Sequence, residues 1–136
     1  MNLSENFTLE ELTASYTARS RKINNTPNEM QIENLTRLCV EILQPIRNHW
    51  GNPLIVTSGF RSPELNMVVG GSATSQHLKG EAVDIISYDT RKLWKLITEM
   101  IKKGEIRVGQ LIDEKNLSWI HISLPSGTRL NQTLRL

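Results

Sequence analysis

Apolar residues recur at spacings of three and four between Leu35 and Trp50, which is typical of one face of a helix. Thr26 and Glu29 predict its start through a capping box, and Gly51 predicts its end. The stripe consists of Leu35, Leu38, Cys39, Ile42, Leu43, Ile46 and Trp50. The pattern therefore predicts one long core helix, in which the single cysteine is an inert apolar residue.

Two shorter helices are indicated by their capping signals. Thr8 and Glu11 form a capping-box pattern for a helix that ends near Ser15. A third helix is expected to begin with Thr90 as its cap and to end at Gly104. Each is a local signal, readable without knowledge of the rest of the chain.

Five short apolar or alternating stretches predict strands at residues 54–57, 82–86, 108–112, 119–123 and 130–136. The first reads as a buried strand, and the last as an edge strand. The loop after residue 57 is expected to hold one helical turn that begins at Ser62. Because the helices come first and the strands surround one helix, we expect an α+β fold with a small, mainly antiparallel sheet and helices packed on one side. The length predicts a single domain, residues 1–136.

Composition narrows the class of protein. Hydrophobic residues make up 38% and charged residues 22% of the chain, which excludes a disordered polypeptide. The net charge of +2 comes without a basic stripe interleaved with aromatics, so no nucleic-acid partner is expected. No apolar run is long enough for a transmembrane segment. The first residues lack the features of a signal peptide, so synthesis in the cytoplasm is expected.

Two strands carry polar residues that need a partner. Asp84 alternates with Val83 and Ile85, and a carboxylate among such neighbours requires a cation or several donors. Gly80 permits a sharp turn that brings His77 toward Asp84.

In the strand predicted at residues 119–123, His121 faces away from the apolar side that Ile120 and Ile122 form. Two imidazoles and one carboxylate suit zinc, which in catalytic sites has three protein ligands and a fourth position for water. From spacing alone, however, a hydrogen-bonded histidine and aspartate without metal is the stronger interpretation.

A wider, ordered set of motifs changes that balance. It comprises residues 58–62 (SGFRS), 75–84 (SQHLKGEAVD), 110–114 (QLIDE) and 119–123 (WIHIS), preceded by 7–12 (FTLEEL). This set resembles the zinc D-Ala-D-Ala peptidase family, which includes carboxypeptidases and phage endolysins that cut the peptides of bacterial cell walls. The wider superfamily includes lysostaphin-like enzymes and the hedgehog signalling domain. The resemblance covers nearly the whole chain and implies the same fold.

The resemblance also implies roles for individual residues. The implied zinc ligands are His77, Asp84 and His121, and the implied substrate-binding residues are Arg61, Ser75, Gln76 and Trp119. In many relatives the catalytic acid lies three residues before the final histidine, where this chain has Ser118. The sequence instead resembles the branch in which the acid follows Gln-Leu-Ile-x, which makes Glu114 the expected base. Asp113 is the competing candidate, and strand alternation puts the two carboxylates on opposite faces.

Together these features predict a zinc metallopeptidase that hydrolyses amide bonds in peptidoglycan stem peptides. Zinc would activate a water, Glu114 would act as general base, and Arg61 would bind a terminal carboxylate or the developing oxyanion. The sequence does not distinguish a carboxypeptidase from an endopeptidase. A monomer is expected, acting at the cell wall if released, as a phage or prophage enzyme would be. The alternative is a non-hydrolytic, zinc-stabilised binding module, which the hedgehog relative shows to be possible.

Overall fold

The computed structural model describes residues 1–136 and contains one five-stranded sheet and a small hairpin. The strands of the large sheet follow in the spatial order β3 (Ile55–Ser58), β4 (Ala82–Ile86), β6 (Trp119–Ser123), β5 (Gln110–Glu114) and β7 (Gln132–Arg135). Only the β5–β7 pair is parallel. The predicted α+β class and the mainly antiparallel sheet are therefore confirmed.

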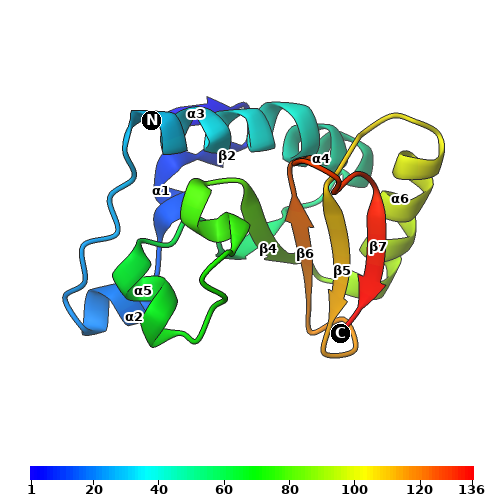
Figure 1. The fold of residues 1–136 in the computed structure, drawn as a ribbon. Helices are drawn as coiled ribbons and strands as arrows, with labels where there is room; N and C mark the ends of the chain where they lie inside the picture. The colour runs from blue at the N-terminus through cyan, green and yellow to red at the C-terminus, as the bar shows by residue number, and fades with distance from the viewer.

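The chain has eight helical segments, of which the longer ones pack on one face of this sheet. The eight segments are α1 (Leu9–Thr13), α2 (Tyr16–Ser20), α3 (Glu29–Leu38), the π-helix η1 (Cys39–Leu43), α4 (Gln44–Trp50), α5 (Pro63–Val68), the 3₁₀-helix η2 (Gln76–Lys79) and α6 (Thr90–Lys102). Figure 1 shows α3 and α4 forming one long rod above the strands, with α6 beside it. A core of 23 buried residues joins α1, α3, η1, α4 and α6 to the sheet. None of the helices is both long and apolar enough to cross a membrane.

The long apolar stripe is confirmed, because all seven of its residues are buried. Its start was wrong by two residues, since Asn28 and not Thr26 is the cap. The Asn28 side chain accepts from the Gln31 backbone, and the Gln31 side chain accepts from the Asn28 backbone, both at 2.8 Å. Gln31 also donates to the Leu78 carbonyl, so a tertiary contact supports the cap at Asn28 over the one at Thr26.

Three other expectations need correction. The strand predicted at residues 54–57, β3, was expected to be buried but lies at the edge of the sheet, where Ile55 is 54% exposed. The cap of α6 is Asp89, whose carboxylate accepts from the Lys92 backbone, rather than Thr90. Strand β5 begins at Gln110 because the backbone N–H of Val108 donates to a side chain instead of joining the ladder. Sequence patterns also missed helix α2 and the hairpin of β1 (Asn2–Ser4) with β2 (Phe7–Thr8).

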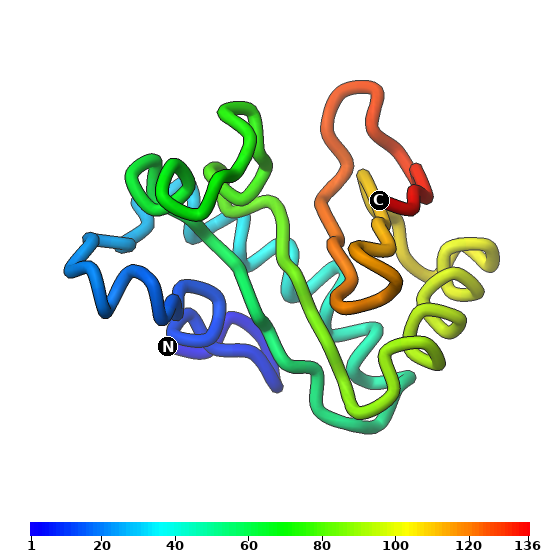
Figure 2. Tube along the Cα trace, turned by 90° about the horizontal axis from the view of Figure 1, so that it is seen from below, coloured from blue at the N-terminus to red at the C-terminus, as the bar shows by residue number.

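Strand alternation divides the large sheet into two chemically different faces. Val83, Ile85, Ile120 and Ile122 are fully buried against the helices. Cys39 lies in the same core, and burial raises the pKa of its thiol to about 12, which fits the expected inert residue. The intervening residues of β4 and β6 point to the opposite face, where the predicted metal ligands lie. Seen from below, the helix α3–α4 passes behind the strands (Figure 2).

Candidate metal centre and active site

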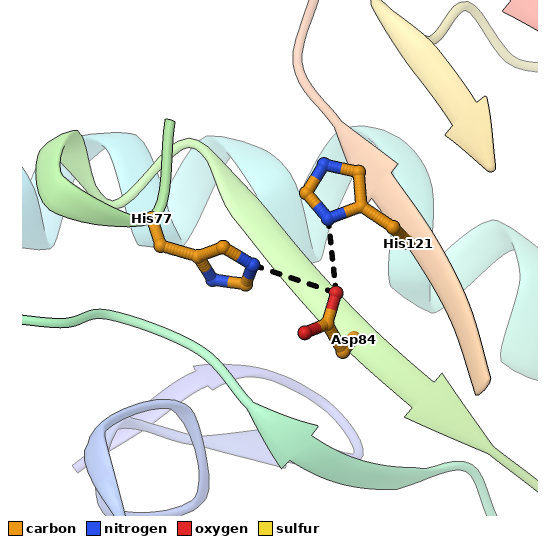
Figure 3. Close-up of side chains that lie close together, drawn as sticks. All are labelled: His77, Asp84 and His121. Carbon is orange, nitrogen blue, oxygen red and sulfur yellow. Dashed lines mark hydrogen bonds and ion pairs between the residues drawn. The ribbon is translucent and has the colours of Figure 1, made fainter. Parts of the chain in front are cut away.

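Three predicted metal ligands converge on the face of the sheet that the helices leave open. Asp84 of β4 and His121 of β6 are direct partners in the strand register, and His77 comes from η2 (Figure 3). The Asp84 Oδ1 atom lies 2.9 Å from His121 Nδ1 and 3.4 Å from His77 Nε2. One ligand atom from each residue lies within 4.8 Å of the other two. Two nitrogens and one carboxylate oxygen at this separation fit a zinc site with three protein ligands.

The backbone fixes the orientation of the His77 ring. Its Nδ1 atom lies 2.7 Å from the Gly59 carbonyl oxygen, and because a carbonyl only accepts, Nδ1 carries the hydrogen. The lone pair of Nε2 then faces the Asp84 carboxylate, so two acceptors confront each other. A cation between them, or a proton on Nε2, reconciles this arrangement. A ring nitrogen bound to a carbonyl is the usual support for a metal-ligating histidine.

Two glycines allow the loop of His77 to pack closely. A Cβ atom at Gly59 would collide with the Leu12 carbonyl, so only glycine fits where the carbonyl partner of His77 is needed. Gly80 ends η2 in the left-handed conformation at φ +73°, as the predicted sharp turn requires. At the start of η2, the Ser75 hydroxyl accepts from the His77 backbone at 3.2 Å.

Asp84 is buried and nevertheless held as a carboxylate. Burial by itself would raise its pKa, but the hydrogen bond from His121 and the close approach of the two imidazoles outweigh that effect and hold the pKa well below its usual range. Its second oxygen lies 3.6 Å from the Arg61 guanidinium. Burial lowers the pKa of Arg61, and the nearby carboxylate opposes that shift. One of the three candidate ligands is therefore anionic.

A cavity of about 300 Å³ opens over these ligands. All eight residues that the sequence singled out line it: Arg61, Ser75, Gln76, His77, Asp84, Glu114, Trp119 and His121. Two of them use their side chains mainly for local structure. Ser75 caps η2, and the Gln76 amide donates to the Leu124 carbonyl at 3.1 Å. Ser75 and Gln76 therefore shape the wall of the cavity.

The two candidate acids point in different directions. In the β5–β6 register, Glu114 pairs with Trp119 on the open face, whereas Asp113 pairs with Ile120. Asp113 Oδ1 accepts from the Leu117 backbone at 2.6 Å and closes the turn between the strands. Of the two carboxylates, only that of Glu114 lines the cavity.

The turn between β5 and β6 sets the position of Trp119. Lys115, Asn116 and Leu117 all have positive φ angles, between 48° and 59°, which is unusual for three consecutive residues other than glycine. The Lys115 ammonium lies 5.5 Å from the centre of the Trp119 ring. Trp119 is half-buried and forms part of the cavity wall.

Five further lining residues were missed by the sequence analysis: Ser72, Thr74, Gln110, Ile112 and Arg129. Gln110, Ile112 and Glu114 are every second residue of β5 and share one face, so strand periodicity was a signal that pointed to the first two. Arg129 lies in the loop before β7 and belongs to none of the quoted motifs. Only the folded chain brings it to the site.

The third histidine is not part of the metal centre. His49 Nε2 lies 2.7 Å from a carboxylate oxygen of Glu105, at the end of the long helix. The cluster that could hold a metal contains three residues and no fourth protein ligand. An open coordination position is characteristic of catalytic zinc sites.

Comparison with known protein families agrees with this geometry. A family model described as Peptidase M15 matches residues 5–123, which include the three predicted metal ligands, Arg61 and Glu114. No curated protein gives a significant match to the chain. The family match confirms the resemblance to zinc D-Ala-D-Ala peptidases and supports a zinc-dependent hydrolase of peptidoglycan-type substrates. Because the matched segment spans most of the sequence, the chain belongs to the Peptidase M15 family.

Proposed function

We propose that the protein is a zinc metallopeptidase that hydrolyses amide bonds in peptidoglycan stem peptides. The observation that carries this proposal is the convergence of two histidines, an aspartate and Glu114 on one polar cavity. A metal-ligand cluster beside a separate carboxylate supplies the two groups that metal-assisted amide hydrolysis needs.

The residues that would hold the zinc are His77, through Nε2, with Asp84 and His121. When bound, zinc lowers the pKa of a coordinated water toward about 7 and polarises the carbonyl of the amide. The Gly59 carbonyl keeps His77 in the tautomer that offers Nε2, and Arg61 restrains the second oxygen of Asp84. The chain thus orients two of the three ligands before any metal arrives.

Glu114 is the proposed general base. It accepts a proton from the attacking water and delivers it to the leaving amine. Its place at the end of β5, on the same face as His121, puts the carboxylate in the wall of the cavity. Asp113 is unsuited to this role because its carboxylate closes the β5–β6 turn.

Arg61 is proposed to stabilise the negative charge that develops on the carbonyl oxygen. Its guanidinium is oriented by Ser58 at 3.1 Å and by Asn66 at 3.3 Å. A preoriented cation in a partly buried site is more effective than a solvated one, because it needs no reorganisation during the reaction. Trp119 would pack against the peptide.

The substrate assignment rests on the family and on the polar character of the cavity. Both a carboxypeptidase and an endopeptidase are compatible with this site. The expected monomeric state remains part of the proposal. A non-hydrolytic, zinc-stabilised module would be favoured by a fourth protein ligand, but the cluster offers three and His49 pairs with Glu105.

The test is mass spectrometry of soluble products released from purified peptidoglycan. Zinc-loaded protein, chelated protein and Glu114→Gln are compared, with Glu99→Gln on the exposed side of α6 as a control of equal charge change. We expect products from the zinc-loaded and control proteins only, with turnover of Glu114→Gln reduced by about 10²–10⁴ while zinc is retained. The masses of the released products would identify the amide bond that is cut. Equal release by chelated protein would contradict zinc catalysis, and near-normal turnover of Glu114→Gln would reassign the base.

A further inference from the structure

Two arginines line the cavity, and they differ in how fully they are engaged. Arg61 contacts Ser58, Asn66 and the Asp84 carboxylate, and its side chain is 17% exposed. The Arg129 side chain makes a single hydrogen bond, in which Nη1 donates to the Gln76 Oε1 atom at 3.3 Å. A guanidinium has five N–H donors, so most of those on Arg129 have no partner in the protein.

The charges of the cavity leave Arg129 without a counterion. The ionic side chains in its wall, apart from the histidines, are Arg61, Arg129, Asp84 and Glu114. Asp84 faces Arg61, and no carboxylate lies within ion-pair distance of Arg129. The neutral amide of Gln76 orients the guanidinium but does not neutralise it. A planar cation with free donors matches the geometry of a carboxylate.

The backbone holds Arg129 at the cavity by a tight turn. Ser126 and Arg129 exchange backbone hydrogen bonds of 3.2 and 2.9 Å around Gly127, which has a φ of +56°. The base of this loop is fixed where Leu124 donates to the Glu81 carbonyl and Asn131 donates to the Val108 carbonyl. In Figure 2 the loop, in orange, projects from the strands in the same direction as the green segment before β4. The cation is therefore positioned before any substrate binds.

We propose that Arg129 binds a carboxylate of the substrate and so determines which stem peptides the site accepts. This inference rests on the proposed function and adds a recognition element to it. Residue 129 lies beyond the segment that the family model matches, so the family likeness does not assign it. Stem peptides offer two carboxylates of the required chemistry, the C-terminal one and the α-carboxylate of a γ-linked glutamate.

The test measures binding separately from turnover. Isothermal titration of the zinc-loaded Glu114→Gln protein uses three synthetic probes: L-Ala-γ-D-Glu-L-Lys-D-Ala-D-Ala, its C-terminal amide, and its α-amide at the glutamate. We expect Arg129→Gln to weaken binding of the free acid by roughly 10- to 100-fold, as for loss of a charge-assisted hydrogen bond. Arg129→Lys should restore part of the affinity because it keeps the charge. Arg91→Gln, an exposed site on α6, should leave binding unchanged.

The two amidated probes identify the carboxylate. One of the two amidated probes should bind weakly even to the protein that keeps Arg129, and Arg129→Gln should weaken its binding no further. The carboxylate that is blocked in this probe is the one that Arg129 recognises. The proposal is overturned if Arg129→Gln weakens all three probes equally, if it weakens none, or if none binds. Zinc content of Arg129→Gln checks that the site is intact. If the binding pattern holds but the wild-type protein releases nothing from peptidoglycan, the proposed hydrolysis fails while the role of Arg129 stands.

Discussion

The two faces of strands β4 and β6 carry opposite kinds of residue at alternate positions. Val83, Ile85, Ile120 and Ile122 are fully buried beneath the helices, whereas Asp84 and His121 face the cavity. The same ten backbone positions therefore supply core residues and two of the three predicted metal ligands. Because one face is already rigidly packed, the ligands on the other are held without a dedicated scaffold.

Buried titratable groups sharpen the same contrast. Cys39 on the core side stays a neutral thiol, since burial, with a smaller contribution from the negative charge of Glu11, raises its pKa to about 12. Asp84 on the site side is also buried, but the imidazoles lower its pKa below the usual range. Burial alone therefore does not decide the charge of a group; its hydrogen-bond partners do.

The largest effect is expected from removing the anionic ligand. Asp84→Asn should abolish stoichiometric zinc binding and reduce turnover by at least about 10³-fold, because the site loses its only carboxylate ligand. The core face is untouched, so the cooperative unfolding transition should persist. Elemental analysis and circular dichroism measure the two properties. Stoichiometric zinc in the variant would exclude Asp84 as a ligand.

The opposite result, a loss of stability with zinc binding retained, is expected for a substitution at the neighbouring residue Ile85. Ile85→Ala should lower the free energy of unfolding by about 2–5 kcal/mol, because it leaves a cavity in the core. The folded fraction should still bind one zinc. Urea unfolding and metal analysis on the same sample test this. A variant that unfolds normally but loses zinc would show that the two faces are not separable.

A smaller effect is expected where the backbone supports a ligand. Gly59→Ala should weaken zinc binding by about 10- to 100-fold, because the added Cβ displaces the carbonyl that orients His77. Gly104→Ala is the control, because its Cβ would meet no atom within 4 Å and the left-handed φ of +74° should cost only about 1–2 kcal/mol of stability. Zinc affinity from competition with a chelator is the measurement. Equal affinities in the two variants would argue against this role of Gly59.

The smallest effect concerns acid stability of the metal-free protein. The pKa of Asp84 is lower in the folded state than its ordinary value of 3.8, so its contribution to stability is present above that value and is lost as pH falls. Wild-type protein should therefore lose more unfolding free energy than Asp84→Asn between about pH 5 and pH 3. Urea titrations with chelator present measure the difference. Parallel curves would indicate that the carboxylate is not stabilised by the fold.

Local sequence patterns were sufficient to predict much of this structure. The alternation in residues 82–86 and 119–123 placed Asp84 and His121 opposite the core, and the capping box at Thr8 formed as expected. These features depend on neighbours one to four residues apart, so a single sequence displays them. The prediction of a zinc site came from the ordered motifs and their resemblance to a family, since spacing alone favoured a simple hydrogen bond.

The remaining features depend on contacts across the chain. Strand register decides which of Glu114 and Asp113 faces the cavity. Loop packing decides the bond from His77 to the Gly59 carbonyl and the position of Arg129 at the cavity. The cap at Asn28 likewise involves a contact to residue 78. Periodicity gives the face on which a side chain lies, but its partner is set by long-range packing. The residue types of the site were therefore written in the sequence, whereas their partners were decided only when the chain folded.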